Sequence, residues 1–219
     1  MANVLVLNSG SSSLKCVLYD ADQHGIHATP QWEAQADWPD LPGPATVKMR
    51  LRGAAEEERH IEVDSLKAVI EHLVGDLIPA LRPAGIDVVG HRVVHGGLEF
   101  RESTLISDRT RAAIAKLAEI APLHNPQALA GIEAIDDLLK NVRQVAVFDT
   151  SFHATLPPES YLYPGPLDWP DKGWRRYGFH GISHSYVSRR AAALLHADLS
   201  SLRMITCHLG NGCSLCAIR

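Results

Sequence analysis

The feature that most constrains the fold is the first twenty residues, in which two apolar runs flank a small polar turn. The runs span residues 4–7 and 14–19, and the turn between them reads Asn-Ser-Gly-Ser-Ser-Ser. This pattern predicts a strand–turn–strand hairpin. Because small side chains let the backbone approach an anion, and because Lys15 follows the turn, the hairpin indicates a phosphate site. A plain flexible turn is the alternative, and the spacing is not that of a P-loop.

The next hundred and thirty residues alternate between strand-like and helix-like patterns. Asp64, Ser107 and Asn125-Pro126 are expected to begin three helices. Strands are predicted at residues 46–52, 86–94 and 144–149, the last a near-continuous apolar run typical of a strand buried on both faces. No clear period marks residues 21–45, and the charged residues 54–60 are expected to be exposed. These elements predict a layered α/β domain that ends near Thr150.

The remaining residues predict the beginning of a second domain. Residues 151–176 are rich in Pro, Tyr and Trp and are expected to be irregular, and a helix is predicted at 186–196. Two strands at 202–208 and 213–218 flank a Leu-Gly-Asn-Gly turn. A strand, a small polar turn and a strand therefore occur near both ends of the chain.

Composition and charge exclude several classes of protein. With 46% hydrophobic and 21% charged residues, the chain is typical of a soluble globular protein. A net charge of −4 gives no reason to expect a nucleic-acid or membrane partner. No segment is long and apolar enough to span a membrane, and the N-terminus lacks a signal-peptide pattern. The four cysteines form no disulfide framework, so we expect reduced thiols and a cytoplasmic location.

Several polar residues lie where chemistry is plausible. Asp149 ends a buried strand, the position where ligands bind in open α/β sheets, although a turn residue is the alternative. Arg92 lies within an apolar strand, so it forms either a structural ion pair or a clamp for carboxylate or phosphoryl oxygens. His124, His180 and His208 each lie beside Pro or Gly, but their spacing does not favour a zinc site.

Six short motifs occur in one order along the chain. They are NSGSSSLK (8–15), GHRVVHGG (90–97), APLHNP (121–126), FDTSFH (148–153), YGFHGISH (177–184) and HLGNG (208–212). Together they resemble the acetate kinase family, with propionate kinases as near relatives, over residues 3–218. The family belongs to the superfamily of acetate and sugar kinases, heat-shock chaperones and actin, whose members have two ribonuclease-H-like domains. The resemblance implies a first such domain at residues 1–150 and part of a second at 151–219.

The resemblance also implies a reaction and a set of site residues. The reaction is reversible, Mg²⁺- or Mn²⁺-dependent phosphoryl transfer from ATP to acetate, which gives acetyl phosphate and ADP. The implied catalytic residues are Asp149, Arg92 and His180, with Asn8 and Asp149 near the metal and His124 in support. Residues implied to bind the acyl group are Arg92, Val94, Leu123 and Phe179. Residues implied to bind nucleotide phosphates are Ser11, Ser13, Lys15, His208, Leu209, Gly210, Asn211 and Gly212.

Family chains continue well beyond Arg219, and the resemblance implies that the further part holds a second essential arginine, an acidic metal ligand, the adenosine pocket and the closing helix of the first domain. We therefore expect a truncated form that is inactive alone, from a parent that is a homodimer. Propionate kinase remains an alternative, as does a non-catalytic fragment acting as an interaction module. A sugar kinase is disfavoured, because Val94 and Phe179 are apolar and few carboxamides are present to hold sugar hydroxyls.

Overall fold

A computed structural model describes residues 1–23, 25–80, 85–210 and 212–219. The chain forms two compact units. The first comprises Met1–Val93 with Thr104–Ala146, and the second comprises Val94–Ser103 with Val147–Arg219. The assignment of residues 1–150 and 151–219 to two ribonuclease-H-like domains stays a prediction.

The described part of the first unit is organised around a mixed sheet of nine strands. Their order is β6-β5-β4-β2-β1-β7-β9-β8, with β3 paired to β2. The predicted N-terminal hairpin is confirmed, because β1 and β2 pair antiparallel, and β1 also runs parallel to β7. The strands are β1 Ala2–Ser9, β2 Ser13–Asp22, β3 Gly25–Ile26, β4 Trp32–Asp37, β5 Gly43–Leu51, β6 Glu57–Val63, β7 Val88–Val93, β8 Thr104–Leu105 and β9 Arg143–Phe148, of which the last two residues belong to the second unit.

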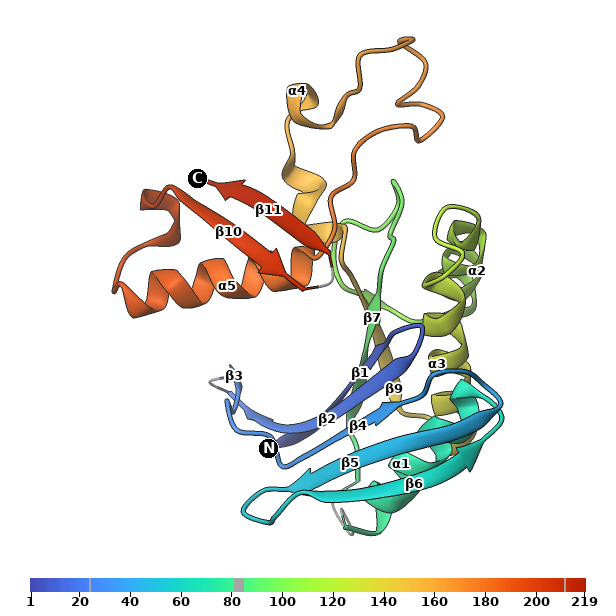
Figure 1. Ribbon diagram of the computed structural model, residues 1–219. Coiled ribbons are helices and arrows are strands. Elements are labelled where there is room, and N and C mark those ends of the chain that lie inside the picture. The colour runs from blue at the N-terminus through green and yellow to red at the C-terminus, as the bar shows by residue number, and fades with distance from the viewer. Residues whose placement is uncertain (24, 81–84, 211) are drawn as a thin grey trace. The chain divides into compact units, whose positions relative to one another are not determined.

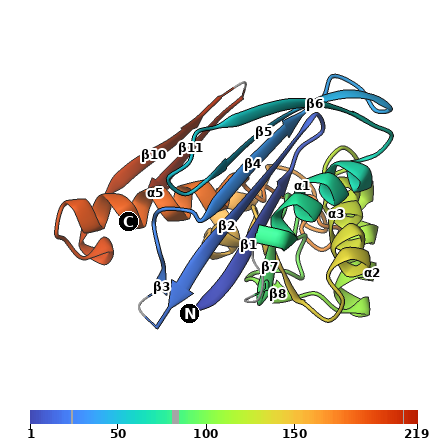
Figure 2. The ribbon, with the colours of Figure 1, turned by 90° about the horizontal axis from the view of Figure 1, so that it is seen from below.

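Two helices of this unit pack against each other and against the sheet (Figure 2). They are α1 (Leu66–Ala80) and α3 (Asn125–Leu138), and α3 also contacts α2 (Asp108–Lys116), which the 3₁₀ turn η1 (Leu117–Glu119) follows. Alternation along β1 buries Leu5 and Leu7 in the same core as Ile70 of α1 and Ile135 of α3. The neighbouring residues of β1 therefore lie on the other face of the sheet, and Asn8 is one of them.

β4 and β6, together with the two-residue strands β3 and β8, occupy segments where no strand was predicted. β4 lies within residues 21–45 and buries Trp32, Ala34 and Ala36 on one face. The alternation exists, but alanine gives it too little hydrophobic contrast to stand out. β6 overlaps the charged residues 54–60 and is mostly exposed at the end of the sheet order. Charged side chains on an edge strand block pairing with other chains, which explains how a polar segment forms a strand here.

The predicted helix beginnings differ in accuracy. Ser107 caps α2 as predicted, because its hydroxyl accepts from the N–H of Thr110 at 3.2 Å. α3 begins at Asn125 as predicted. The predicted cap of α1, Asp64, is wrong: the hydroxyl of Ser65 accepts the N–H of Ala68 at 3.2 Å instead. One-residue ambiguity is expected where two adjacent side chains can both act as N-caps.

The second unit contains one long helix and a two-stranded sheet. Helix α5 (Gly181–Leu194) packs along strand β10, which pairs antiparallel with β11 (Figure 1). The hairpin buries Thr206 on one face, whereas Ile205 and Leu215 are exposed on the other. The remaining elements are η2 Ser151–Thr155, α4 Pro158–Tyr161, η3 Leu199–Ser201, β10 Met204–Leu209 and β11 Cys213–Ile218. In the described ranges, no helix has the length and apolar character needed to cross a bilayer.

A buried polar network includes His91 of β7, the strand that also carries the candidate residue Arg92. His91 Nε2 lies 2.7 Å from Gln144 Oε1, and Gln144 Nε2 donates to Asp136 Oδ1 at 2.6 Å. Because the amide nitrogen of Gln144 is used by Asp136, its oxygen accepts from His91, which makes Nε2 the protonated ring nitrogen. Asp136 also forms an ion pair with Arg111. The network links β7, β9 and α3, and burial lowers the pKa of His91 to about 4.

We expect His91 to make the folded state sensitive to acid. Between pH 6.5 and 4 the unfolded chain binds a proton at His91 that the folded chain does not, so the free energy of unfolding falls as the pH falls. The free energy of unfolding is highest above pH 6.5, and it is lower by about 2–3 kcal/mol near pH 4. Urea unfolding at several pH values measures this loss. His91→Gln should flatten the dependence of the free energy of unfolding on pH, whereas the control His60→Gln, at an exposed histidine, should not. Equal pH dependence in the parent and both variants would contradict the assignment of the acid sensitivity to His91.

Candidate active site

The turn that joins β1 and β2 exposes small polar groups at the end of the first unit's sheet. The N–H of Gly10 donates to the carbonyl of Ser13 at 2.7 Å, which closes the turn. Ser11 and Lys15 are exposed, and Ser13 is half-buried. Lys15 lies directly opposite Asn8 in the antiparallel register, so both side chains project from the same face of the sheet. The turn therefore presents hydroxyls, an amide and a cation together, as the sequence predicted.

Arg92 and Asn8 meet on this face. β1 and β7 are parallel, and the register that pairs Leu7 with His91 places Asn8 beside Arg92. Arg92 Nη1 donates to Asn8 Oδ1 at 3.0 Å. His91 is buried in the network described above, so alternation along β7 turns Arg92 to the opposite face. The strand thus anchors a guanidinium, whose planar fork suits carboxylate or phosphoryl oxygens.

Two other predicted residues of the first unit lie at the beginning of α3. Leu123 is 69% exposed, and His124 occupies the N-cap position of α3 without a capping hydrogen bond from its side chain. The acyl-binding role of Leu123 and the supporting role of His124 stay predictions.

Asp149 lies in the second unit, directly after the last residue of β9, and is 1% exposed. Its carbonyl oxygen accepts the N–H of Gly181 at 2.9 Å. A Cβ atom added at Gly181 would lie 2.2 Å from that oxygen, so only glycine permits this approach. The first residue of α5 therefore fixes the backbone that carries Asp149.

We expect Gly181→Ala to destabilise the protein by about 1–3 kcal/mol, because a backbone oxygen must move to admit the methyl group. Gly75→Ala in α1 is a matched control, since nothing lies within 4 Å of its added Cβ. That control should be neutral or stabilising by up to about 1 kcal/mol, because alanine is the better helix former. Urea midpoints measure both changes, and an equal shift in the two variants would contradict the close approach.

His180 and His208 form a stacked pair in the second unit. Their ring centroids lie 4.1 Å apart with an interplanar angle of 12°. His180 Nδ1 lies 2.8 Å from Ser214 Oγ, and His208 Nδ1 lies 2.9 Å from Ser183 Oγ. His180 has a left-handed backbone with φ of 55°, which is uncommon outside glycine and is typical of functional sites. Each ring is thus held by a hydroxyl and by its neighbour.

The positive φ of His180 also explains why the beginning of α5 was wrongly placed. The helix was predicted at residues 186–196, whereas it begins at Gly181. A left-handed histidine directly before a helix is set by tertiary contacts and has no local sequence signal. Ser183 and Ser214 were likewise not singled out, although Ser183 lies within the YGFHGISH motif and Ser214 follows the second Gly turn.

Sequence reasoning missed a buried histidine in this unit. His184 is 1% exposed, and its Nδ1 lies 2.7 Å from Thr206 Oγ1 on β10. In the described part of the chain its Nε2 has no hydrogen-bond partner. Burial, then the nearby His153, His208 and His180, lower the pKa of His184 against a smaller opposing effect of Asp149, which favours the neutral ring. The final His of the YGFHGISH motif was a signal that could have pointed to it.

The predicted apolar residues of the second unit adjoin another histidine. Phe179 is 41% exposed, and its ring meets that of His95 edge-on with centroids 5.6 Å apart. His95 also meets Tyr177 at 4.5 Å, and burial lowers its pKa. Val94, which precedes His95, is half-buried. Phe179 thus belongs to an aromatic cluster around His95, and Val94 is its neighbour in the chain, while the role of both residues in acyl binding stays a prediction.

The second Gly turn connects β10 to β11. The N–H of Gly210 donates to the carbonyl of Gly212 at 2.9 Å, and Leu209 is 73% exposed. Asn211, which was predicted to bind nucleotide phosphate, lies outside the described residues. The hairpin itself is confirmed, because β10 and β11 pair from Met204 to Ile218. Its role in nucleotide binding stays a prediction.

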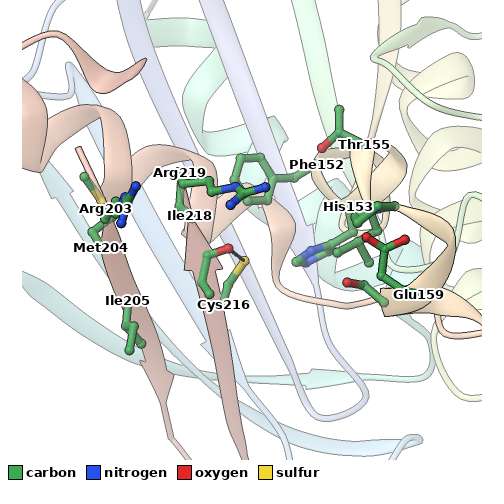
Figure 3. A pocket seen from close by; sticks show the side chains of 14 residues that line it. Phe152, His153, Thr155, Glu159, Arg203, Met204, Ile205, Cys216, Ile218 and Arg219 are labelled. Atoms are coloured by element: carbon green, nitrogen blue, oxygen red, sulfur yellow. Dashed lines mark hydrogen bonds between the residues drawn. The ribbon is translucent and has the colours of Figure 1, made fainter. Parts of the chain in front are cut away.

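A cavity of about 1050 Å³ lies elsewhere in the second unit. Figure 3 shows His153 and Glu159 on one side, with side chains of β10 and β11 opposite them. None of the sequence-predicted site residues lines it. This cavity therefore does not coincide with the residues that the family resemblance implies.

All four cysteines are free in the structure. Within residues 1–23, 25–80, 85–210 and 212–219, no group of three or more His, Cys, Asp or Glu side chains is arranged to hold a metal ion. The oxygen donors predicted to lie near a metal are the amide of Asn8 in the first unit and the carboxylate of Asp149 in the second.

Comparison with known proteins gives one consistent result. The pattern of a family described as "Acetokinase family" matches residues 3–219. The acetate kinase of a Cyanothece species is 52% identical and that of Nostoc punctiforme 47% identical, each over 99% of this chain and 55% of the relative. This chain thus spans about half the length of these curated relatives.

Solved structures confirm the mixed α/β fold. A propionate kinase from Francisella tularensis superposes with a TM-score of 0.88 at 36% identity, and an acetate kinase from Porphyromonas gingivalis with a TM-score of 0.84 at 37% identity. Both comparisons cover 100% of this chain and 55% of the solved chain. The similarity therefore extends along the whole of this chain.

Proposed function

Because the chain belongs to the acetokinase family, we propose that it forms part of a kinase that transfers a phosphoryl group reversibly between ATP and acetate. The products of the forward reaction are acetyl phosphate and ADP. The observation that carries this proposal is the Arg92 guanidinium, hydrogen-bonded to Asn8 beside an exposed Gly/Ser turn. An arginine anchored next to small hydroxyl-bearing residues suits a substrate that carries both a carboxylate and phosphoryl oxygens.

We propose that Arg92 binds the acyl carboxylate and the phosphoryl group in transfer. Acetate is already an anionic nucleophile, so the site needs alignment and charge stabilisation rather than a strong base. Asn8 holds the guanidinium through its Oδ1 atom, which limits the orientations available to Arg92. A fixed planar fork can align two oxygens at once, and this alignment is the part of catalysis assigned to the first unit.

His180 is assigned the role of donor to the transferred phosphoryl group. Ser214 holds one of its ring nitrogens and His208 stacks on the ring face, so the ring is oriented by two independent contacts. We propose that the other nitrogen, Nε2, donates to a phosphoryl oxygen. Donors fixed before the reaction stabilise developing charge without reorganising in the transition state.

The family implies Mg²⁺ or Mn²⁺ together with ATP or ADP as substrate. Asn8 and Asp149 supply oxygen donors, the type that Mg²⁺ prefers, and Mg²⁺ commonly takes only one or two protein ligands beside water and phosphate oxygens. Each of these two residues therefore has the donor chemistry that the ion takes. When bound, the ion neutralises part of the phosphate charge. We assign the turn at residues 11–13 and the turn between β10 and β11 to the nucleotide phosphates, since glycine and serine allow close backbone approach.

Acetate is the proposed substrate, and propionate is the second candidate because a solved propionate kinase shares 36% identity. We expect Val94 to limit the acyl pocket, so that acetate is preferred by about 10- to 200-fold in kcat/KM, the usual effect of one methylene. The measurement is acetyl or propionyl hydroxamate formation by a full-length acetokinase that contains this chain. Val94→Ala is expected to raise kcat/KM for propionate. Equal values for the two acids would remove Val94 as the determinant, and no turnover of either would overturn the function.

The remaining proposals follow from the same assignment. The partners are small molecules: acetate, acetyl phosphate, ATP and ADP. A full-length protein of this family is proposed to be a cytoplasmic homodimer. These expectations rest on the family resemblance of residues 3–219.

A further inference from the structure

A second cavity of the second unit gathers positive charge away from the candidate site residues. Its volume is about 800 Å³, within the range of small-molecule pockets. One wall is the outer face of α5, another is the short segment from Arg101 to Ser103, and the floor includes Ser151 and Phe152 of η2. None of the residues assigned above to acyl, nucleotide or metal binding lines it.

The wall formed by α5 follows from the helix period. Ile182, Tyr186 and Arg189 lie on one stripe, at spacings of four and three residues. The opposite stripe, which includes His184 and Ser188, is buried. The helix thus turns one side toward the β10–β11 hairpin and leaves the other open to the cavity.

The charge on the cavity wall is unbalanced. Arg101, Arg189 and Arg190 line it, and among the described residues none of these three side chains has a hydrogen-bond or ion-pair partner. Glu102 is the single carboxylate among the lining residues. Three guanidiniums against one carboxylate leave an excess of two positive charges, in a chain whose net charge is −4. Like charges gathered in this way repel unless an anion joins them.

The geometry points to a binding site for a small organic phosphate with an apolar or aromatic body. A phosphate monoester carries about −1.5 to −2 charges at neutral pH, which matches the excess of two. Guanidiniums bind phosphate oxygens in a bidentate manner, and the hydroxyls of Ser103 and Ser185 can donate to the remaining oxygens. Phe152, Ile182 and Tyr186 supply the apolar surface for the body of the ligand.

Calorimetric titration of the 219-residue chain tests the site, with phenyl phosphate and inorganic phosphate as the two probes. Phenyl phosphate should bind saturably and more tightly than inorganic phosphate, because only phenyl phosphate contacts the apolar wall. The dissociation constant of phenyl phosphate should rise by about tenfold or more in the double variant Arg189→Gln with Arg190→Gln, and it should also rise with salt. Both arginines are exposed, so the variant should fold, which circular dichroism verifies.

Two single variants locate the binding. Arg143→Gln removes one exposed arginine of the first unit and should leave the affinity within about twofold of the parent. Lys15→Gln alters the turn assigned to nucleotide phosphates and should also leave phenyl phosphate binding intact. No saturable binding, an equal loss in Arg143→Gln, or a loss in Lys15→Gln without one in the double variant would each overturn the cavity site.

Discussion

The purified 219-residue chain should form acetyl phosphate from ATP and acetate at least about 10³-fold more slowly than a full-length acetokinase. Phosphoryl transfer depends on several cations and donors that act together, and removal of one arginine clamp alone has effects of this size. Arg92 and Lys15 are the cations that the described residues offer to the proposed substrates. The curated relatives are nearly twice as long, with this chain covering 55% of each, so further binding groups are expected in the part it does not span.

The measurement is hydroxamate formation by the purified chain, with the acetate kinase of the Cyanothece relative as the active control. Calorimetry with ADP gives the second readout. We expect weak ADP binding, because the groups proposed here contact only the phosphates. Turnover of about 1–100 s⁻¹, the usual range of kinases, would show that the part of the relatives that this chain does not span is dispensable for catalysis.

The elements predicted correctly are those whose signal is local. The β1–β2 hairpin follows from two apolar runs around a Gly/Ser turn, and β9 follows from a continuous apolar run that only a buried strand explains well. Asp149 directly follows this apolar run, so its position at the end of a buried strand could be predicted from the length of the run alone. The candidate residues therefore came from strand ends and turns, where short patterns have few alternative structures.

The features that could not be predicted from the sequence depend on tertiary contacts or have weak hydrophobic contrast. β4 buries alanines between polar residues, so its alternation is present but faint. α5 begins five residues earlier than predicted, because Gly181 packs on the carbonyl of Asp149, which is distant in sequence. His91 meets Gln144 across 53 residues of sequence, a separation at which no periodicity can pair them. Hydrogen-bond partners this far apart in the sequence can be identified only from the structure.

Asp149→Asn should lower the rate of acetyl phosphate formation by about 10²-fold or more in a full-length acetokinase that contains this chain. The substitution keeps the size of the side chain and removes one preorganised charge, a loss that typically has this effect. The hydrogen bond from Gly181 is accepted by the main-chain oxygen of residue 149, so the substitution keeps this contact and the fold should survive. Asp171→Asn makes the same change at an exposed carboxylate and should leave the rate unchanged.

The deciding measurement compares hydroxamate formation by the parent, Asp149→Asn and Asp171→Asn, each with its urea midpoint measured on the same sample. We predict unchanged midpoints together with a fall of about 10²-fold or more in kcat for Asp149→Asn alone. A rate for Asp149→Asn close to that of the parent, in a folded protein, would contradict the assignment of this strand-end carboxylate to phosphoryl transfer.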